Sequence, residues 1–179
     1  RPEIDFSVSL VGQVETVERQ LIALTENQND VFEGLAENER CLIRGAAGTG
    51  KTILAINFFK KVSGAGANCA YFCYNKQLAA YVWEAIRPTV ECCFHSYMES
   101  VAGAAFPDLW RDREADAGHY YSDILPERFI EAYVDSGAEP FDYLIVDEAQ
   151  DLMNEKYLEV FDLILSGGLK NGKWTFFID

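Results

Sequence analysis

The residues at positions 45–52 are of the types that bind phosphate. They read Gly-Ala-Ala-Gly-Thr-Gly-Lys-Thr and match the pattern G-x-x-x-x-G-K-[ST] at every fixed position. Glycines let the backbone turn tightly enough to direct successive N–H groups at phosphate oxygens. Lys51 supplies a mobile positive charge, and the hydroxyl of Thr52 is a hard ligand suited to Mg²⁺.

The flanking sequence predicts the elements that would position this loop. The apolar stretch 41–44 has strand character, and 53–59 continues well as a helix. A helix that begins at the loop adds the positive end of its dipole to the phosphate site. The alternative is an ordinary glycine-rich turn between a strand and a helix. The expected phosphate-binding residues are Gly45, Ala46, Ala47, Gly48, Thr49, Gly50, Lys51 and Thr52.

A second group of chemical residues follows the buried strand predicted at 143–146. Asp147 is placed to hold Mg²⁺ together with Thr52, directly or through water. Glu148 is placed to orient and deprotonate a water aimed at the terminal phosphate. Alone, the pair could equally be acidic turn residues at a strand end. Beside a phosphate loop, the two carboxylates indicate hydrolysis of a nucleotide, with Lys51, Asp147 and Glu148 as catalytic residues.

Composition and charge bound the class of protein. The 179 residues favour one domain, and the 49% hydrophobic content is typical of a globular protein with a core. No run of 18 apolar residues is present, so we expect no membrane segment.

The five cysteines stand in apolar runs, which favours buried, reduced thiols and a cytoplasmic protein. A metal site at Cys92, Cys93 and His95 is disfavoured because a closed zinc site needs four well-spaced ligands. The net charge of −14 argues against nucleic-acid binding unless a local basic groove exists.

The order of elements predicts an α/β fold. Strands expected at 68–74, 89–94 and 174–178 join those at 41–44 and 143–146 and alternate with helices, which gives a doubly wound parallel sheet with helices on both faces. Ligands of such sheets bind at the carboxyl ends of the strands, where the loop, Asn75, His95, Asp147 and Asp179 all fall. Residues 97–139 predict a small helical insertion, and residues 1–23 a peripheral segment with a helix from about Val11.

These motifs together resemble the UvrD/Rep-type superfamily 1 DNA helicases, over residues 24–179. The motif Asp147-Glu148-Ala149-Gln150-Asp151 carries the resemblance, with the phosphate loop and Gln28. It implies the first RecA-like, ATP-binding domain of a P-loop NTPase. Gln28 would read adenine, although by pattern alone it is a capping-box partner of Thr25. Gln150 would couple the phosphate site to the DNA site. The resemblance places the contacts to single-stranded DNA at Tyr74, Asn75, Lys76, Phe94, His95 and Ser96.

The sequence also departs from that family. Ile53 stands where many relatives carry arginine, and the strand at 177–179 resembles the start of a motif whose glutamine would lie beyond it. The second RecA-like domain is absent, so we expect this chain to bind Mg-ATP but to hydrolyse it poorly. The resemblance implies a DNA-dependent ATPase that moves on single-stranded DNA in a longer protein. The alternative is a nucleotide-dependent regulatory switch that acts on a protein partner without DNA. A small-molecule phosphotransferase is a weaker third option.

Overall fold

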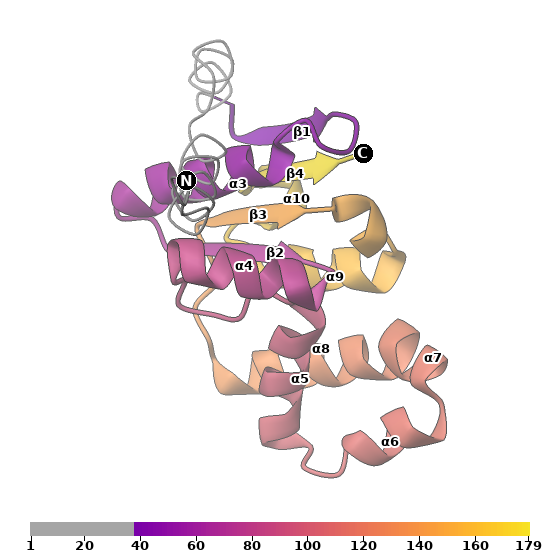
Figure 1. Ribbon diagram of the computed structural model, residues 1–179. Coiled ribbons are helices and arrows are strands. Elements are labelled where there is room, and N and C mark those ends of the chain that lie inside the picture. Colours follow the sequence, from indigo (N-terminus) through magenta and orange to yellow (C-terminus); the bar gives the residue numbers. More distant parts are fainter. Residues whose placement is uncertain (1–37) are drawn as a thin grey trace, which may run out of the picture.

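The structure, a computed structural model, describes residues 38–179. Its centre is a four-stranded parallel sheet in the order β1-β4-β3-β2 (Figure 1). The strands are β1 (Arg40–Arg44), β2 (Cys69–Cys73), β3 (Tyr143–Asp147) and β4 (Lys173–Ile178). Because β2 and β3 are buried along their whole length, they read as continuous apolar runs, as strands covered on both faces do.

Two helices cover one face of the sheet. They are α3 (Lys51–Gly64), which follows the phosphate loop, and α4 (Lys76–Ile86), which follows β2. Alternate strand residues such as Tyr71 and Ile145 point into this layer and meet Phe58 and Phe59 of α3. The helix that opens at the loop is therefore fixed by its own apolar face.

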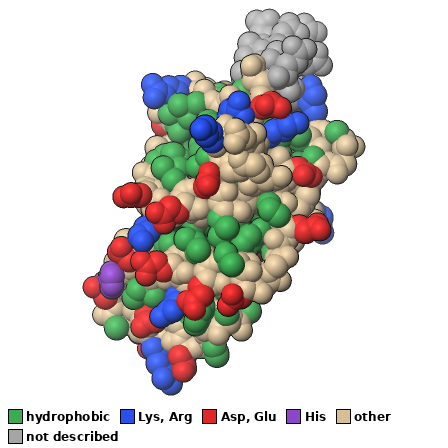
Figure 2. Space-filling view, turned by 180° about the vertical axis from the view of Figure 1, so that it is seen from behind, with side chains coloured by type: hydrophobic (Ala, Val, Ile, Leu, Met, Phe, Trp, Pro, Cys, Tyr) green, Lys and Arg blue, Asp and Glu red, His purple; other side chains and the backbone are tan. Residues whose placement is uncertain are grey.

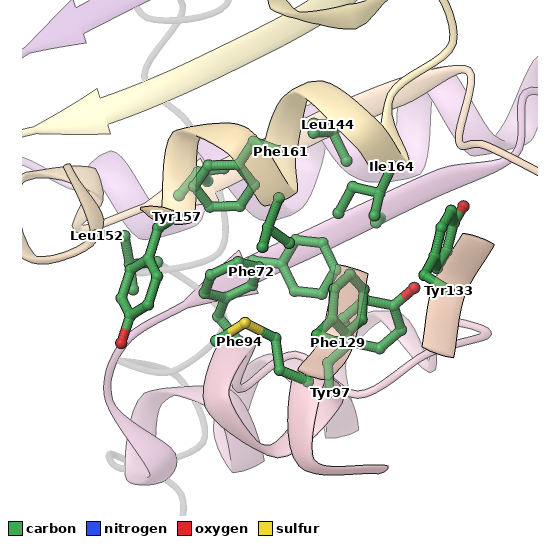
Figure 3. Packing of buried hydrophobic residues seen from close by; sticks show 14 of the residues in the cluster. Phe72, Phe94, Tyr97, Phe129, Tyr133, Leu144, Leu152, Tyr157, Phe161 and Ile164 are labelled. Carbon is green, nitrogen blue, oxygen red and sulfur yellow. The ribbon is translucent and has the colours of Figure 1, made fainter. Parts of the chain in front are cut away.

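The opposite face carries the larger core. It packs α5 (Phe94–Ala105), α8 (Leu125–Ser136) and α9 (Glu155–Ile164) beneath Phe72 and Leu144 of the sheet. Figure 3 shows this aromatic layer, in which the rings of Phe94 and Phe161 stack with centroids 4.5 Å apart. The position of α5 relative to the sheet is set by these rings.

Short helical pieces complete the fold. Between α5 and α8 the chain forms α6 (Trp110–Ala115), α7 (Ala117–His119) and the π-helical turn η1 (Tyr120–Ile124). The 3₁₀ turn η2 (Ala149–Leu152) follows β3, and α10 (Gly168–Asn171) precedes β4. Residues 97–139, predicted to be a helical insertion, run from within α5 through α6, α7, η1 and α8. Within residues 38–179, no helix is long and apolar enough to cross a membrane.

One local prediction is wrong. Residues 89–94 form no strand; Cys93 makes only an isolated bridge with Cys73, and the chain enters α5 at Phe94. A short apolar run reports burial, which a packed helix start satisfies as well as a strand does. Ser96 therefore lies inside α5. The helix expected from Val11 lies outside the described residues.

Candidate active site

The loop between β1 and α3 has the geometry of an anion-binding turn. Gly48 and Gly50 adopt φ values of +78° and +87°, a region that glycine enters without strain. The helical hydrogen-bond ladder starts with Leu54 N donating to Gly50 O, so the amides of the first turn of α3 have no intrahelical acceptor. No acidic side chain stands in that turn. The helix therefore presents N–H groups and its positive end to the loop, where a phosphate would bind.

Asp147, at the end of β3, lies directly beside the first turn of α3. Thr52 Oγ1 donates a 2.6 Å hydrogen bond to Asp147 Oδ2, and the Tyr71 hydroxyl donates a 2.9 Å bond to the same oxygen. The backbone N–H of Glu148 donates to Oδ1 at 3.0 Å. The Asp147 side chain is 0% exposed, and none of the ion pairs among the described residues includes it. A buried carboxylate without a cation is a natural counter-charge for a divalent metal.

The oxygen chemistry here fits Mg²⁺. Because the Thr52 hydroxyl gives its proton to Asp147, its lone pairs remain available for a cation. Thr52 and Asp147, predicted separately from sequence, are thus brought into contact across 95 residues. Thr52, through its hydroxyl, and Asp147, through its carboxylate, are the residues that would hold such an ion.

Glu148 is held in an unusual backbone conformation. Its φ of +51° and ψ of +42° lie in the left-handed region, which costs a non-glycine residue about 1–2 kcal/mol. The strain turns the chain from β3 into η2 and leaves the carboxylate half-buried beside Asp147. Burial raises the pKa of Glu148, and the charges of Asp147, Asp151 and Asp179 raise it further, against the opposing effect of Lys51. Such an environment suits a group that accepts a proton.

Lys51 occupies the loop itself. Its Nζ donates to the backbone oxygens of Gly45 and Ala46, at 2.5 and 3.0 Å, and pairs with Asp179 Oδ1 at 2.5 Å. The Gln150 Oε1 accepts a 3.3 Å bond from the backbone N–H of Asp179. A short chain of contacts therefore joins Gln150 on η2 to the ammonium group in the loop through the end of β4.

A cleft of about 560 Å³ adjoins this rim. It brings together residues predicted from two separate segments, since Tyr74, Asn75 and Lys76 line it beside His95. Tyr74 is 49% exposed, and its ring meets the His95 ring edge-on with centroids 5.2 Å apart. Asn75 also caps α4, because its Oδ1 accepts from the backbone N–H of Gln77 at 2.8 Å. The cleft offers aromatic edges and one cationic side chain, Lys76.

The back of the cleft is a hydrogen-bond relay. Tyr157 donates its hydroxyl proton to the backbone oxygen of Tyr121 at 2.9 Å, and His95 Nε2 lies 2.7 Å from the same hydroxyl. With that proton committed, Nε2 must carry the hydrogen of a neutral imidazole. Burial lowers the pKa of His95, and Lys76 lowers it further while Glu99 opposes the shift.

Two of the residues predicted to contact DNA, Phe94 and Ser96, lie outside this cleft. Phe94 is 0% exposed and stacks within the core, so its side chain is not available for a contact with DNA in this structure. The apolar side chain is stabilised by burial against Phe161, and it supports His95 from behind. Ser96 faces a neighbouring hollow lined by Lys76 and Trp83, outside the cleft of His95. Gln28 lies outside the described residues.

Sequence reasoning missed three side chains at this rim. Tyr71 donates its hydroxyl hydrogen to Asp147, and Tyr121 and Tyr157 close the cleft. Tyr71 had a signal, since a tyrosine in a fully buried strand needs a partner for its hydroxyl. Tyr121 and Tyr157 stand in segments whose helical pattern explains them as core residues, so no pattern marked them.

Comparison with known proteins places these residues in a family. The family described as Schlafen group 3, DNA/RNA helicase domain, matches residues 38–163, which include the loop, Asp147, Glu148 and the cleft. The fold resembles the crystal structure of Pif1 helicase from Candida albicans, with a TM-score of 0.52 and 17% identity over 88% of this chain. The chain spans 32% of the length of that Pif1 chain. No curated protein sequence matches it. The predicted fold class, an α/β RecA-like parallel sheet, is confirmed by this likeness.

Proposed function

Because the chain belongs to the Schlafen group 3 DNA/RNA helicase domain family, we propose that it is the ATP-binding half of a helicase motor. In the longer protein, hydrolysis of Mg-ATP would drive movement on single-stranded DNA, as in the UvrD/Rep-type helicases of superfamily 1. The observation that carries the nucleotide part is Asp147, a buried carboxylate that contacts Thr52 at the phosphate loop and lacks a cationic partner among the described residues.

Each loop residue has a distinct task in this proposal. The amides of residues 45–52 bind the β- and γ-phosphates, and Lys51 leaves its carbonyl partners to reach the outer phosphates. Thr52 and Asp147 would hold Mg²⁺, which would supply positive charge beside the phosphates. Glu148 accepts a proton from the water that attacks the γ-phosphorus, while the bond to the ADP oxygen breaks. Gln28 is proposed to read the adenine edge.

A binding assay tests the nucleotide site in this chain. A fluorescent ATP analogue with Mg²⁺ should bind the wild type, and Lys51→Ala should weaken binding at least tenfold. Glu148→Gln should bind as well as the wild type, because its role is in the chemical step. Equal binding by wild type and Lys51→Ala would remove the phosphate-loop assignment.

Hydrolysis is a property we assign to the longer protein. A second RecA-like domain is proposed to complete the cleft around the γ-phosphate, so this chain alone should turn over slowly. In the longer protein, Lys51→Ala and Glu148→Gln should both abolish turnover stimulated by single-stranded DNA. A rate of ATP hydrolysis that is the same with and without DNA would contradict the proposed movement on DNA.

The cleft of Tyr74, Asn75, Lys76 and His95 is the proposed contact for a single strand. Aromatic edges stack on bases of any sequence, at about 1–3 kcal/mol per base, and Lys76 meets a phosphate. Anisotropy of a labelled oligothymidine, titrated with salt, should show binding that Tyr74→Ala weakens. The matched control is Tyr81→Ala on α4, an equally exposed tyrosine outside the cleft.

A second candidate is a regulatory switch that binds nucleotide and acts on a protein. The net charge of −14 favours it, since phosphate contacts dominate nucleic-acid affinity. Failure of the oligothymidine to bind even at low salt, with nucleotide binding intact, would support the switch.

A further inference from the structure

A groove runs between α8 and α9, away from the phosphate loop. Its volume is about 720 Å³, and its floor consists of Ile130, Met153, Leu158 and Leu163. Met153 is 41% exposed, and the other three are partly buried against the core. Figure 2 views the molecule from behind and shows hydrophobic side chains gathered across the middle of this face, with acidic side chains near them. The groove is thus a strip of apolar surface without a described covering segment.

The walls of the groove are acidic. Glu155, Glu159 and Asp162 line it, and among the described residues none of the three takes part in an ion pair. Lys156, which follows Glu155 on α9, is already paired with Glu127 of α8 at 3.0 Å. An apolar floor with unneutralised carboxylates repels a nucleic acid and attracts a ligand that is both apolar and basic.

The dimensions match one helical segment. The ten residues of α9 span about 15 Å, which corresponds to roughly three helical turns. A partner helix of that length presents apolar side chains at i, i+3 or i+4, and i+7 on one face. We propose that the groove docks a basic amphipathic helix of a protein partner, with its apolar face on Met153 and Leu158 and its Lys or Arg side chains beside Glu155 and Glu159.

Other parts of this chain are poor occupants on grounds of charge. Residues 1–37 contain eight acidic and two basic residues, a net charge of −6. A second copy of the chain carries −14. Both would place like charges against the carboxylates, which costs free energy at an interface. The basic partner is therefore the occupant that the groove favours.

A designed peptide tests the proposal directly. The probe is a fluorescein-labelled helix-forming peptide of about 14 residues, with Leu at i, i+3 and i+7 and Lys on the flanks. Its anisotropy is measured with the 179-residue chain, and a scrambled peptide of equal composition is the control. Binding should weaken about three- to tenfold in the double variant Glu155→Gln/Glu159→Gln, and about threefold in Met153→Ser. The matched control, Glu114→Gln/Glu139→Gln, removes the same charge from exposed positions outside the groove and should bind as the wild type does.

The outcomes separate the possible occupants. Absence of binding, equal binding of the scrambled peptide, or equal loss in both charge variants would overturn the proposal. Self-association in sedimentation that Met153→Ser removes would assign the groove to a second copy instead. If oligothymidine displaces the peptide, and Met153→Ser binds neither the peptide nor the oligothymidine, the groove would be assigned to nucleic acid.

Discussion

The hydroxyl of Tyr71 gives the sharpest test of how Asp147 is held. Tyr71 is 0% exposed and donates a 2.9 Å bond to the buried Asp147 carboxylate. Tyr71→Phe deletes that donor and leaves the ring packing unchanged. A hydrogen bond to a charged group contributes about 1.5–3 kcal/mol to stability. For a chain of this length, about 2 kcal/mol corresponds to a fall in Tm of roughly 4–8 °C.

Tyr143→Phe is the matched control. Its hydroxyl is also buried and also bonded at 2.9 Å, but its partner is the neutral hydroxyl of Thr175. A neutral pair contributes about 0.5–1.5 kcal/mol, so the same chemical change should lower Tm by roughly half as much. The two variants therefore differ only in whether the lost bond reached a carboxylate.

The same pair of variants tests the metal site. A group that orients a metal ligand typically affects metal affinity by about 10–100-fold when removed. Tyr71→Phe should raise the Mg²⁺ concentration needed for nucleotide binding by about tenfold, and Tyr143→Phe should leave it unchanged. Calorimetric scans and a Mg²⁺ titration of the fluorescent nucleotide measure both effects. Equal Tm losses and an unchanged Mg²⁺ requirement would refute the reasoning that Asp147 is a charged, positioned ligand.

Three further predictions concern the same rim. The Tm of His95→Gln should fall less than that of the wild type between about pH 7.5 and pH 5. Burial lowers the pKa of His95 in the folded chain, so the unfolded chain takes up the proton first and the stability of the wild type falls as the pH drops below about 6.5. An equal dependence of Tm on pH in the two proteins would contradict this. Asp179→Asn should tighten nucleotide binding by up to about fivefold, because Lys51 no longer has to leave its ion pair with Asp179, a side chain that is 51% exposed. Weaker binding would instead make Asp179 part of the nucleotide site. Gly50→Ala should cost about 1–2 kcal/mol in chemical denaturation, since its φ of +87° is strained for any side chain, and an unaltered midpoint would show that the loop relaxes.

Much of the fold followed from local pattern. The strands at β2 and β3 were predictable because a strand covered on both faces must be apolar throughout, and the phosphate loop was predictable because few residue types permit its turn. The strand predicted at 89–94 was wrong because burial makes a segment apolar whether it is a strand or the start of a helix. Cys92, Cys93 and Phe94 are buried as apolar residues should be, but the helix that starts at Phe94 buries them as effectively as a strand.

Residue types and their spacing were enough to predict the chemical groups of the site: a loop for phosphate, a hydroxyl for a metal and two carboxylates after a strand. These are local, because the residue types and their spacing fix what each segment can bind. Which of these groups come into contact depends on how the whole chain folds. Thr52 reaches Asp147, Tyr71 supports that carboxylate from an adjacent strand, and Tyr121 and Tyr157 close the cleft behind His95. Such contacts depend on the order β1-β4-β3-β2 and on the packing of α9, which join residues far apart in the chain and leave no mark in the spacing of any one segment.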